Sequence, residues 1–176
     1  MTEPFLPEFS RVFHLEKGLT KAVQFNAKAD ETECNALAKR FELLDIKNFS
    51  VTFTIEASRE AGEYEVEGSG HADVVQACVV TLKDVPEHVD FSFHTKLVHG
   101  VEKPLDEGDY SFLEEEIDVD YYQNSHVDLG EIAAQYLALS LHPYPRAEGV
   151  DASQYIGKDG EVNKDNVFNL LQKLKS

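Results

Sequence analysis

The sequence has few cysteines, few basic residues and no long apolar run, and each shortage excludes a class of protein. Its two cysteines, Cys34 and Cys78, form no zinc or redox spacing motif, so a reducing compartment is expected. No stretch approaches the roughly 18 to 20 apolar residues of a membrane helix. The opening residues 1–7 lack the basic residues and apolar run of a secretory signal. Together these features predict a cytoplasmic protein without a membrane partner.

Basic residues are outnumbered by acidic ones, 16 against 33, which gives a net charge of −17. The imbalance lies in residues 1–141, which hold 11 Lys and Arg and 28 Asp and Glu, whereas residues 142–176 hold five of each kind. Affinity for nucleic acid comes largely from basic groups that displace counterions. The acidic part is therefore not expected to bind nucleic acid non-specifically. Its charge serves solubility alone, or it forms a surface that docks a basic protein.

Signatures of enzymes are also absent. The sequence has no phosphate-binding glycine loop, no Gly-x-Ser-x-Gly and no His-Glu-x-x-His. His71 and Asp73 could touch on one face of a strand, but the pair lacks the third partner and the pocket that catalysis needs. Asp128, close to His126, is explained more simply as a helix cap. We therefore predict no catalytic residue, no cofactor and no bound metal.

Two helices are predicted from their first residues. Asp30–Glu33 reads as an N-cap with an acid three positions on, and the helix it opens runs to about residue 41. Asp128–Glu131 is a second capping signature, and its helix runs to about residue 141, where two prolines stop it.

Alternation of polar and apolar residues predicts several strands. The clearest covers residues 48–57, and a turn joins it to an antiparallel partner that reaches Val74. Gly68 and Gly70 interrupt this partner, which indicates a bulge or a close backbone approach. The fold class is α+β, an antiparallel sheet or partial β-barrel packed with two main helices. Further strands are expected near residues 11–15, 23–27 and 86–97.

One domain is expected over residues 1–146, followed by a polar tail over 147–176. An acidic loop is expected at about 102–124, because residues 106–120 carry eight acids and no base. The tail ends in a short amphipathic C-terminal helix at about 164–175, too short to be stable alone in water. This helix packs on the domain or on a partner.

Six residues are candidates for binding. Tyr144 and Arg146 form an aromatic and cationic patch that could meet a nucleic-acid base or phosphate, although an ordinary loop is the alternative. Cys78 directly follows a long strand and is a core residue, a reactive thiol or the relic of a metal site. Cys34 is interpreted as a core residue. The remaining candidates are Asp73, Asp128 and Glu131.

Two segments resemble the YceD family. Residues 70–82, followed by Val85-Pro86, are similar to its central motif, and Val127 to Arg146 resembles its second motif. The order also agrees: a hairpin with a cysteine, an acidic stretch, an Asp-Leu-Gly-Glu helix and a proline-rich exit. Pro7–Arg11 and the closing residues 167–175 resemble the alphaproteobacterial branch. Many members read Cys-x-Arg-Cys-Leu in the central motif, but Thr81 stands in place of the second cysteine here, so no metal site is expected.

The resemblance implies a role in the accumulation of large-subunit ribosomal RNA, with no assigned enzymatic activity. From the acidic charge we add the hypothesis that the protein acts through basic ribosomal or assembly proteins. Any direct RNA contact is then expected near Tyr144 and Arg146. The competing hypothesis is a small-ligand-binding module or enzyme with its site in the mouth of a β-barrel. A sheet whose interior is filled by phenylalanine and isoleucine side chains would argue against it, and the residues concerned are Phe53, Ile55, Phe91 and Phe93.

Overall fold

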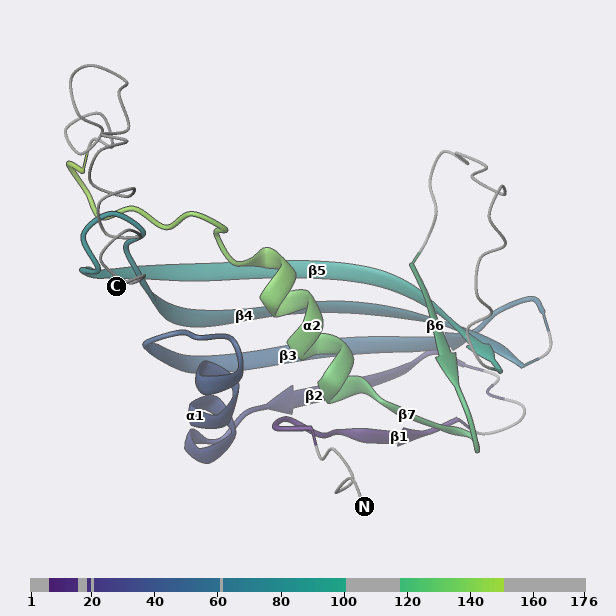
Figure 1. The fold of residues 1–176 in the computed structure, drawn as a ribbon. Coiled ribbons are helices and arrows are strands. Elements are labelled where there is room, and N and C mark those ends of the chain that lie inside the picture. The colour runs from purple at the N-terminus through teal and green to yellow at the C-terminus, as the bar shows by residue number, and fades with distance from the viewer. Residues whose placement is uncertain (1–6, 16–18, 20, 61, 101–117, 151–176) are drawn as a thin grey trace, which may run out of the picture.

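A computed structural model describes most of the chain, namely residues 7–15, 19, 21–60, 62–100 and 118–150. Its larger sheet and two helices confirm the predicted α+β class (Figure 1). The elements in chain order are β1 (Val12–His14), β2 (Val23–Lys28), α1 (Glu31–Arg40), β3 (Asp45–Ala57), β4 (Glu63–Ala77), β5 (Asp84–His99), β6 (Asp118–Tyr122), β7 (His126–Asp128) and α2 (Leu129–Ser140).

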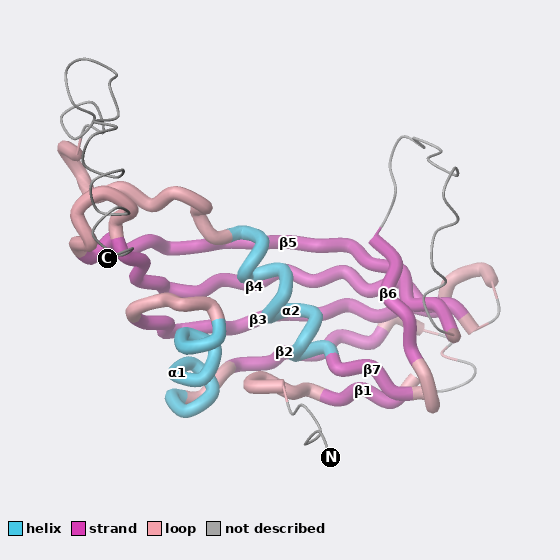
Figure 2. Tube along the Cα trace, in the orientation of Figure 1, coloured by secondary structure: helices cyan, strands magenta, loops and turns pink. Residues whose placement is uncertain are grey.

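The larger sheet has five strands in the order β2-β3-β4-β5-β6, while β1 and β7 form a separate pair. Both helices lie on one face of this sheet, where α2 crosses the long strands and α1 lies beside β3 (Figures 1 and 2). We call this the inner face and the opposite side the outer face. In the described residues the sheet stays open, with β2 and β6 at its edges, and does not close into a barrel. Neither α1 nor α2 reaches the length and hydrophobicity that a membrane span requires.

Local sequence signals account for both helix starts. The Asp30 carboxylate accepts a hydrogen bond from the Glu33 backbone N–H at 2.8 Å, and Glu33 accepts one from the Asp30 N–H at 2.9 Å. This reciprocal pair is the predicted capping box, and it satisfies two N–H groups that the helix cannot pair itself. At α2 the Asp128 carboxylate accepts from the N–H groups of Gly130 and Glu131, as predicted for a cap.

The core lies between the inner face and the helices. Alternate residues of β3 from Phe49 to Ile55 and of β5 from Val89 to Leu97 point inward and are buried, which follows from the alternation of side chains along a strand. A fully buried phenylalanine, leucine or isoleucine side chain contributes roughly 1.5–3 kcal/mol, so these rows supply much of the stability. The buried residues of the two strands and of α2 include Phe49, Val51, Phe53, Ile55, Val89, Phe91, Phe93, Leu97, Leu129, Ala133 and Leu137.

The two glycines of β4 make room for aromatic rings of β5. A Cβ atom on Gly68 would lie 2.1 Å from the Phe93 ring, and one on Gly70 would lie 2.6 Å from the Phe91 ring. The predicted close backbone approach is seen at Gly70, where a Cβ atom would also lie 2.7 Å from the Ser50 carbonyl oxygen, whereas the three atoms nearest to Gly68 all belong to the Phe93 ring. The register shift of the hairpin occurs instead in β3, between Lys47 and Ser50.

The prediction of a loop over about 102–124 is wrong for residues 118–122, which form β6. The sheet is also not wholly antiparallel, because β6 pairs with β5 in parallel. Asp118 and Asp120 are accommodated in this strand by distant hydroxyl groups: the Tyr136 hydroxyl donates to Asp118 at 2.6 Å, and the Thr95 hydroxyl lies 3.1 Å from Asp120. Residues 102–117 and 151–176, including the predicted C-terminal helix, lie outside the described residues.

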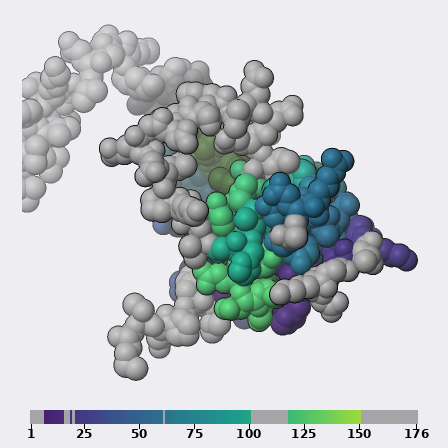
Figure 3. All heavy atoms as spheres, turned by 90° about the vertical axis from the view of Figure 1, so that its right-hand side faces the viewer, coloured from purple at the N-terminus to yellow at the C-terminus, as the bar shows by residue number. Residues whose placement is uncertain are grey.

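The β3–β4 turn meets the β6–β7 segment at one end of the sheet (Figure 3). The Tyr122 hydroxyl donates to the Gly62 carbonyl at 2.8 Å, and the Leu15 N–H donates to the Ser125 carbonyl at 2.9 Å. A hollow of about 660 Å³ lies between these segments, and its walls include Tyr64. The first bond joins β6 to the β3–β4 turn, and the second extends the β1–β7 pair by one position.

Candidate functional site

The six candidate residues fall in three separate places. Cys78, Tyr144 and Arg146 come together at the end of the sheet where β4 turns into β5. Asp128 and Glu131 lie at the start of α2, and Asp73 lies on the outer face. The sequence placed each residue on the correct kind of element, but it did not indicate that Cys78 lies beside Tyr144 and Arg146.

The first group, which we call the sheet-end site, consists of Cys78, Tyr144 and Arg146. A tight turn brings the chain from β4 into β5, closed by hydrogen bonds from the Cys78 N–H to the Lys83 carbonyl at 2.8 Å and from the Leu82 N–H to the Cys78 carbonyl at 2.9 Å. The Val79 N–H donates to the Pro145 carbonyl at 2.9 Å. The segment that leaves α2 is therefore held directly against the turn that contains the cysteine.

The Cys78 thiol is fully buried in this turn. Its pKa is lowered to about 6, first by the hydroxyl of Thr81 and then by the backbone N–H of Ala147, because both groups stabilise the thiolate. Cys34 is also buried, in the core as predicted, but burial raises the pKa of its thiol. The two cysteines therefore differ in chemistry although both are enclosed.

Apolar side chains are exposed beside the buried thiol. Val79, Leu82 and Tyr144 are 50%, 78% and 68% exposed. Leu82 also has a φ of 58°, a left-handed conformation that is unfavourable for a bulky side chain. A hollow of about 510 Å³ adjoins this surface, and Tyr144 and Arg146 form part of its wall. The sheet-end site thus offers an aromatic ring, a guanidinium and aliphatic groups to a partner.

Asp128 fixes the start of the chain to the start of α2. Besides capping the helix, its carboxylate accepts hydrogen bonds from the Ser10 hydroxyl at 2.6 Å and from the Arg11 N–H at 2.7 Å. Gly130 allows this contact, because a Cβ atom there would lie 2.1 Å from the Phe9 carbonyl oxygen. These bonds give Asp128 a role in joining two distant segments.

Glu131 forms a two-pronged ion pair with Arg40, at 2.7 and 2.8 Å, and Arg40 also binds Glu8 at 2.9 Å. The Arg40 guanidinium lowers the pKa of the Glu131 carboxyl, and the bonds to Glu131 raise the pKa of Arg40. This cluster links α1, α2 and the first described residues.

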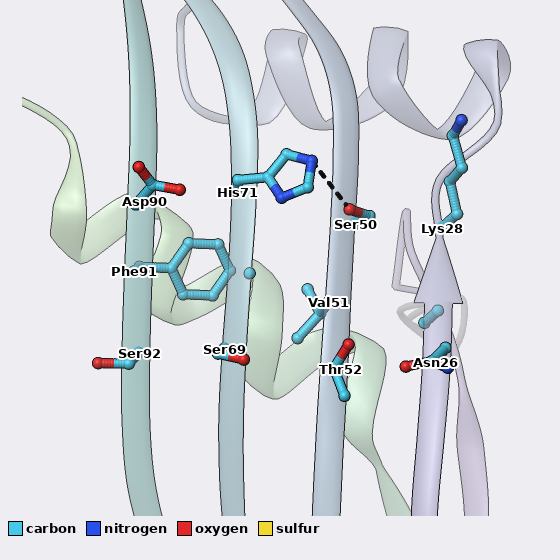
Figure 4. Close-up of a pocket in the computed structure, with 12 residues that line it drawn as sticks. Asn26, Lys28, Ser50, Val51, Thr52, Ser69, His71, Asp90, Phe91 and Ser92 are labelled. Atoms are coloured by element: carbon cyan, nitrogen blue, oxygen red, sulfur yellow. Dashed lines mark hydrogen bonds between the residues drawn. The ribbon is translucent and has the colours of Figure 1, made fainter.

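Asp73 lies on the outer face. The sequence allowed a contact with His71, but the hydrogen bonds of Asp73 are made with other residues. It accepts a hydrogen bond from Asn48 at 2.6 Å and lies 2.6 Å from the ring of His88 on the neighbouring strand. The Asn48 hydrogen bond, followed by that of His88, lowers the pKa of Asp73, and Asp73 raises the pKa of His88. His71 lies 3.2 Å from the Ser50 hydroxyl instead (Figure 4).

A shallow trough of about 820 Å³ runs over the outer face, with both helices behind the strands (Figure 4). Its polar side chains are mainly hydroxyl groups, and an antiparallel sheet commonly presents such a face to water. Within the described part of the chain, no three His, Cys, Asp or Glu side chains are placed to hold a metal ion. The trough offers hydrogen-bond donors and acceptors to a partner. The labelled residues that line it include Asn26, Ser50, Thr52, Ser69, Asp90 and Ser92.

Several contacts of the site could not be read from the sequence. Arg40 and Glu131 are 91 residues apart, and nothing local marks them as partners. The same holds for Val79 and Pro145. The one sequence signal of this apolar surface was a leucine, Leu82, in a turn, because turns usually carry polar residues or glycine.

A family model described as large ribosomal RNA subunit accumulation protein YceD matches residues 66–175. The match includes most of β4 and all of β5, β6, β7 and α2, and it covers all six candidate residues. No curated protein and no solved structure gives a significant match.

Proposed function

Because this chain belongs to the YceD family of large ribosomal RNA subunit accumulation proteins, we propose that it is a non-enzymatic cytoplasmic factor that supports the accumulation of large-subunit ribosomal RNA. Its role is to assist the production or stability of that RNA during ribosome biogenesis. The family name supports the role, and the contacts below are our extension of it.

One observation supports the sheet-end site as the functional surface. The hydrogen bond between the Val79 N–H and the Pro145 carbonyl joins the two segments by which the sequence resembles the family. Exposed apolar groups gather at this junction, and the flanking Arg146 lies beyond the acidic part of the chain. Tyr144 can stack on an unpaired RNA base and Arg146 can bind a phosphate, so direct RNA contact centres here.

The acidic remainder of the chain acts on proteins rather than on RNA. A net charge of −17 repels phosphate groups and attracts the basic proteins of the large subunit and its assembly. Asp73 on the outer face takes part in this attraction. Asp128 and Glu131 contribute indirectly, because their intramolecular bonds fix the position of α2.

The alternative of a ligand site in a barrel mouth has less support. Phe53 and Ile55 are fully buried, and Phe91 and Phe93 are each 7% exposed. These side chains fill the space that such a ligand would occupy.

The test is the ratio of large- to small-subunit ribosomal RNA in the native cell after depletion of the protein. We expect a selective fall of the large-subunit RNA, rescued by the wild-type chain. A Tyr144→Ala, Arg146→Ala variant should rescue poorly, whereas Leu44→Ala, which removes another exposed apolar side chain, should rescue fully. An unchanged ratio after depletion would refute the proposed role, and full rescue by the double variant would refute the sheet-end site.

A further inference from the structure

β5 has an edge that the described strands leave largely unpaired. The strand is 16 residues long, but β6 pairs only with Thr95–His99. The segment that leaves α2 adjoins the first residues of β5, where His142 and Tyr144 line one hollow together with Val85–Glu87. In the described residues no strand pairs with the intervening residues, His88–His94, on the side away from β4.

The register decides which backbone groups face this edge. Cys78 donates to its opposite residue Lys83, so this is a hydrogen-bonded pair, and such pairs recur at every second position of an antiparallel ladder. Val89, Phe91 and Phe93 therefore bond to β4. The N–H and C=O groups of the residues between them, His88, Asp90 and Ser92, point toward the open edge.

The position of a proline agrees with this register. Pro86 has no N–H and belongs to the same outward-directed series, where no bond to β4 is lost. The open edge from His88 to His94 has no proline and no register shift. It can accept an added strand along its whole length.

We propose that this edge binds an extended segment of a basic protein as an additional β-strand. The proposal rests on the proposed function, since it specifies how the protein recognises its basic partners. In such strand addition the backbone supplies the hydrogen bonds, and alternate side chains of the added segment determine which partner fits.

The charges beside the edge select a basic segment. On the outer face, Asp90 has an 80% exposed side chain, and Asp73 and Glu67 lie on the adjacent strand. Among the outer-face charged side chains of β4 and β5, the lysine, Lys96, is paired with Glu63. This set also includes two histidines. His88 is bonded to Asp73 and lies 3.6 Å from Asp90, and His94 lies 3.5 Å from Glu65. Lysine or arginine side chains that project from an added strand on this face would meet a set of side chains in which carboxylates outnumber the single lysine.

The inner side of the edge is apolar. The Tyr136 ring of α2 stacks on Phe93 with centroids 4.3 Å apart, and Leu139, in the next turn of α2, is 78% exposed. The segment that fits therefore alternates basic and apolar residues. A second copy of this chain would bring the same carboxylates together, and RNA would bring phosphates against them, so both are less suited to the edge.

The experiment compares Ser92→Pro with Ser92→Ala. The proline removes an outward N–H and obstructs the edge, but it leaves every bond to β4 intact, whereas the alanine changes only the side chain. The probes are an acetylated and amidated peptide of alternating lysine and valine, its backbone N-methylated form, and purified basic large-subunit ribosomal proteins tested one at a time. Binding is measured by titration, and backbone amide exchange is followed by NMR.

We expect the peptide and at least one ribosomal protein to bind the wild type and Ser92→Ala equally. Ser92→Pro should weaken both by about tenfold, as expected for a lost hydrogen bond with steric obstruction. Bound peptide should slow exchange of the Asp90 and Ser92 amides but not of Phe91 and Phe93, which already bond to β4. The N-methylated peptide should not bind, a result that holds even where Ser92→Pro fails to fold.

Several outcomes would overturn the inference. These are undiminished binding by folded Ser92→Pro, no binding of any probe to the wild type, slowing of the same amides by an RNA oligonucleotide instead, or a dimer of this chain that Ser92→Pro abolishes. The ratio of ribosomal RNAs in depleted cells distinguishes a failure of the strand-addition proposal from a failure of the proposed function. Depletion without any effect on ribosomal RNA refutes the function, whereas full rescue by Ser92→Pro after an effective depletion refutes only the edge.

Discussion

Replacing Arg40 by alanine should lower the free energy of unfolding by about 2 kcal/mol. Arg40 and Glu131 have side chains only 25% and 20% exposed, and Glu8 is 21% exposed. Exposed ion pairs contribute about 0–1 kcal/mol, whereas removal of one partner from a buried pair costs about 3–5 kcal/mol. This cluster lies between the two cases, and the substitution leaves two partly buried carboxylates without their cation.

The measurement is urea denaturation followed by far-UV circular dichroism, because the chain contains no tryptophan for fluorescence. Glu131→Gln is the matched variant, since it keeps the shape of the side chain and one oxygen that Arg40 can bind. A double-mutant cycle between Arg40→Ala and Glu131→Gln gives the coupling of the pair itself. A loss below about 0.5 kcal/mol in Arg40→Ala would place the cluster among ordinary surface pairs and refute the reasoning.

The pH dependence gives a second check of the same cluster. The pKa of Glu131 is lowered from its ordinary value of 4.5 in the folded state. Its stabilising contribution is therefore complete above that value and is lost as the pH falls through the lower folded pKa. The wild type should lose stability below about pH 4.5 more steeply than Arg40→Ala does. Parallel curves for the two proteins would contradict this assignment.

Three further results are expected. Gly68→Ala should destabilise the protein by about 1–3 kcal/mol in urea denaturation, because its Cβ would overlap the Phe93 ring, and a neutral effect would contradict the close approach. Asp128→Ala should cost about 1–2 kcal/mol by loss of the cap, with Asp128→Asn closer to wild type; equal losses would instead assign the effect to charge. Cys78 should titrate near pH 6 by thiolate absorbance in a Cys34→Ala background, and Thr81→Val should raise that midpoint, whereas a wild-type midpoint above pH 8 would exclude the thiolate.

The parts of the fold that follow from neighbouring residues could be predicted from the sequence. Asp30 and Glu33 make their capping box within one turn, and the alternation from Phe49 to Ile55 reports which side of β3 is buried. β6 could not be predicted in this way, because its acids resemble a solvated loop. Asp118 is held by the hydroxyl of Tyr136, 18 residues further along the chain, so the local sequence carried no sign of the strand.

In the candidate site, too, the features that depend on single residues could be predicted and those that depend on distant contacts could not. The residue types at Cys78, Tyr144 and Arg146 marked them individually, but their meeting depends on a hydrogen bond from Val79 to Pro145. A single sequence contains no information on such a pairing. The open edge of β5 was equally hidden, since it depends on where along β5 the pairing with β6 begins.

The bond between Arg11 and Asp128 also has a consequence for synthesis of the chain on the ribosome. These residues are 117 positions apart, and closing a loop of that length costs on the order of 4 kcal/mol of chain entropy. The two successive hairpins, β3–β4 and β4–β5, pair residues that are close in the sequence and can form as soon as these strands emerge from the ribosome. Their inner row of phenylalanines then faces solvent until α2 has been translated, so the nascent chain is expected to need protection from aggregation during that interval.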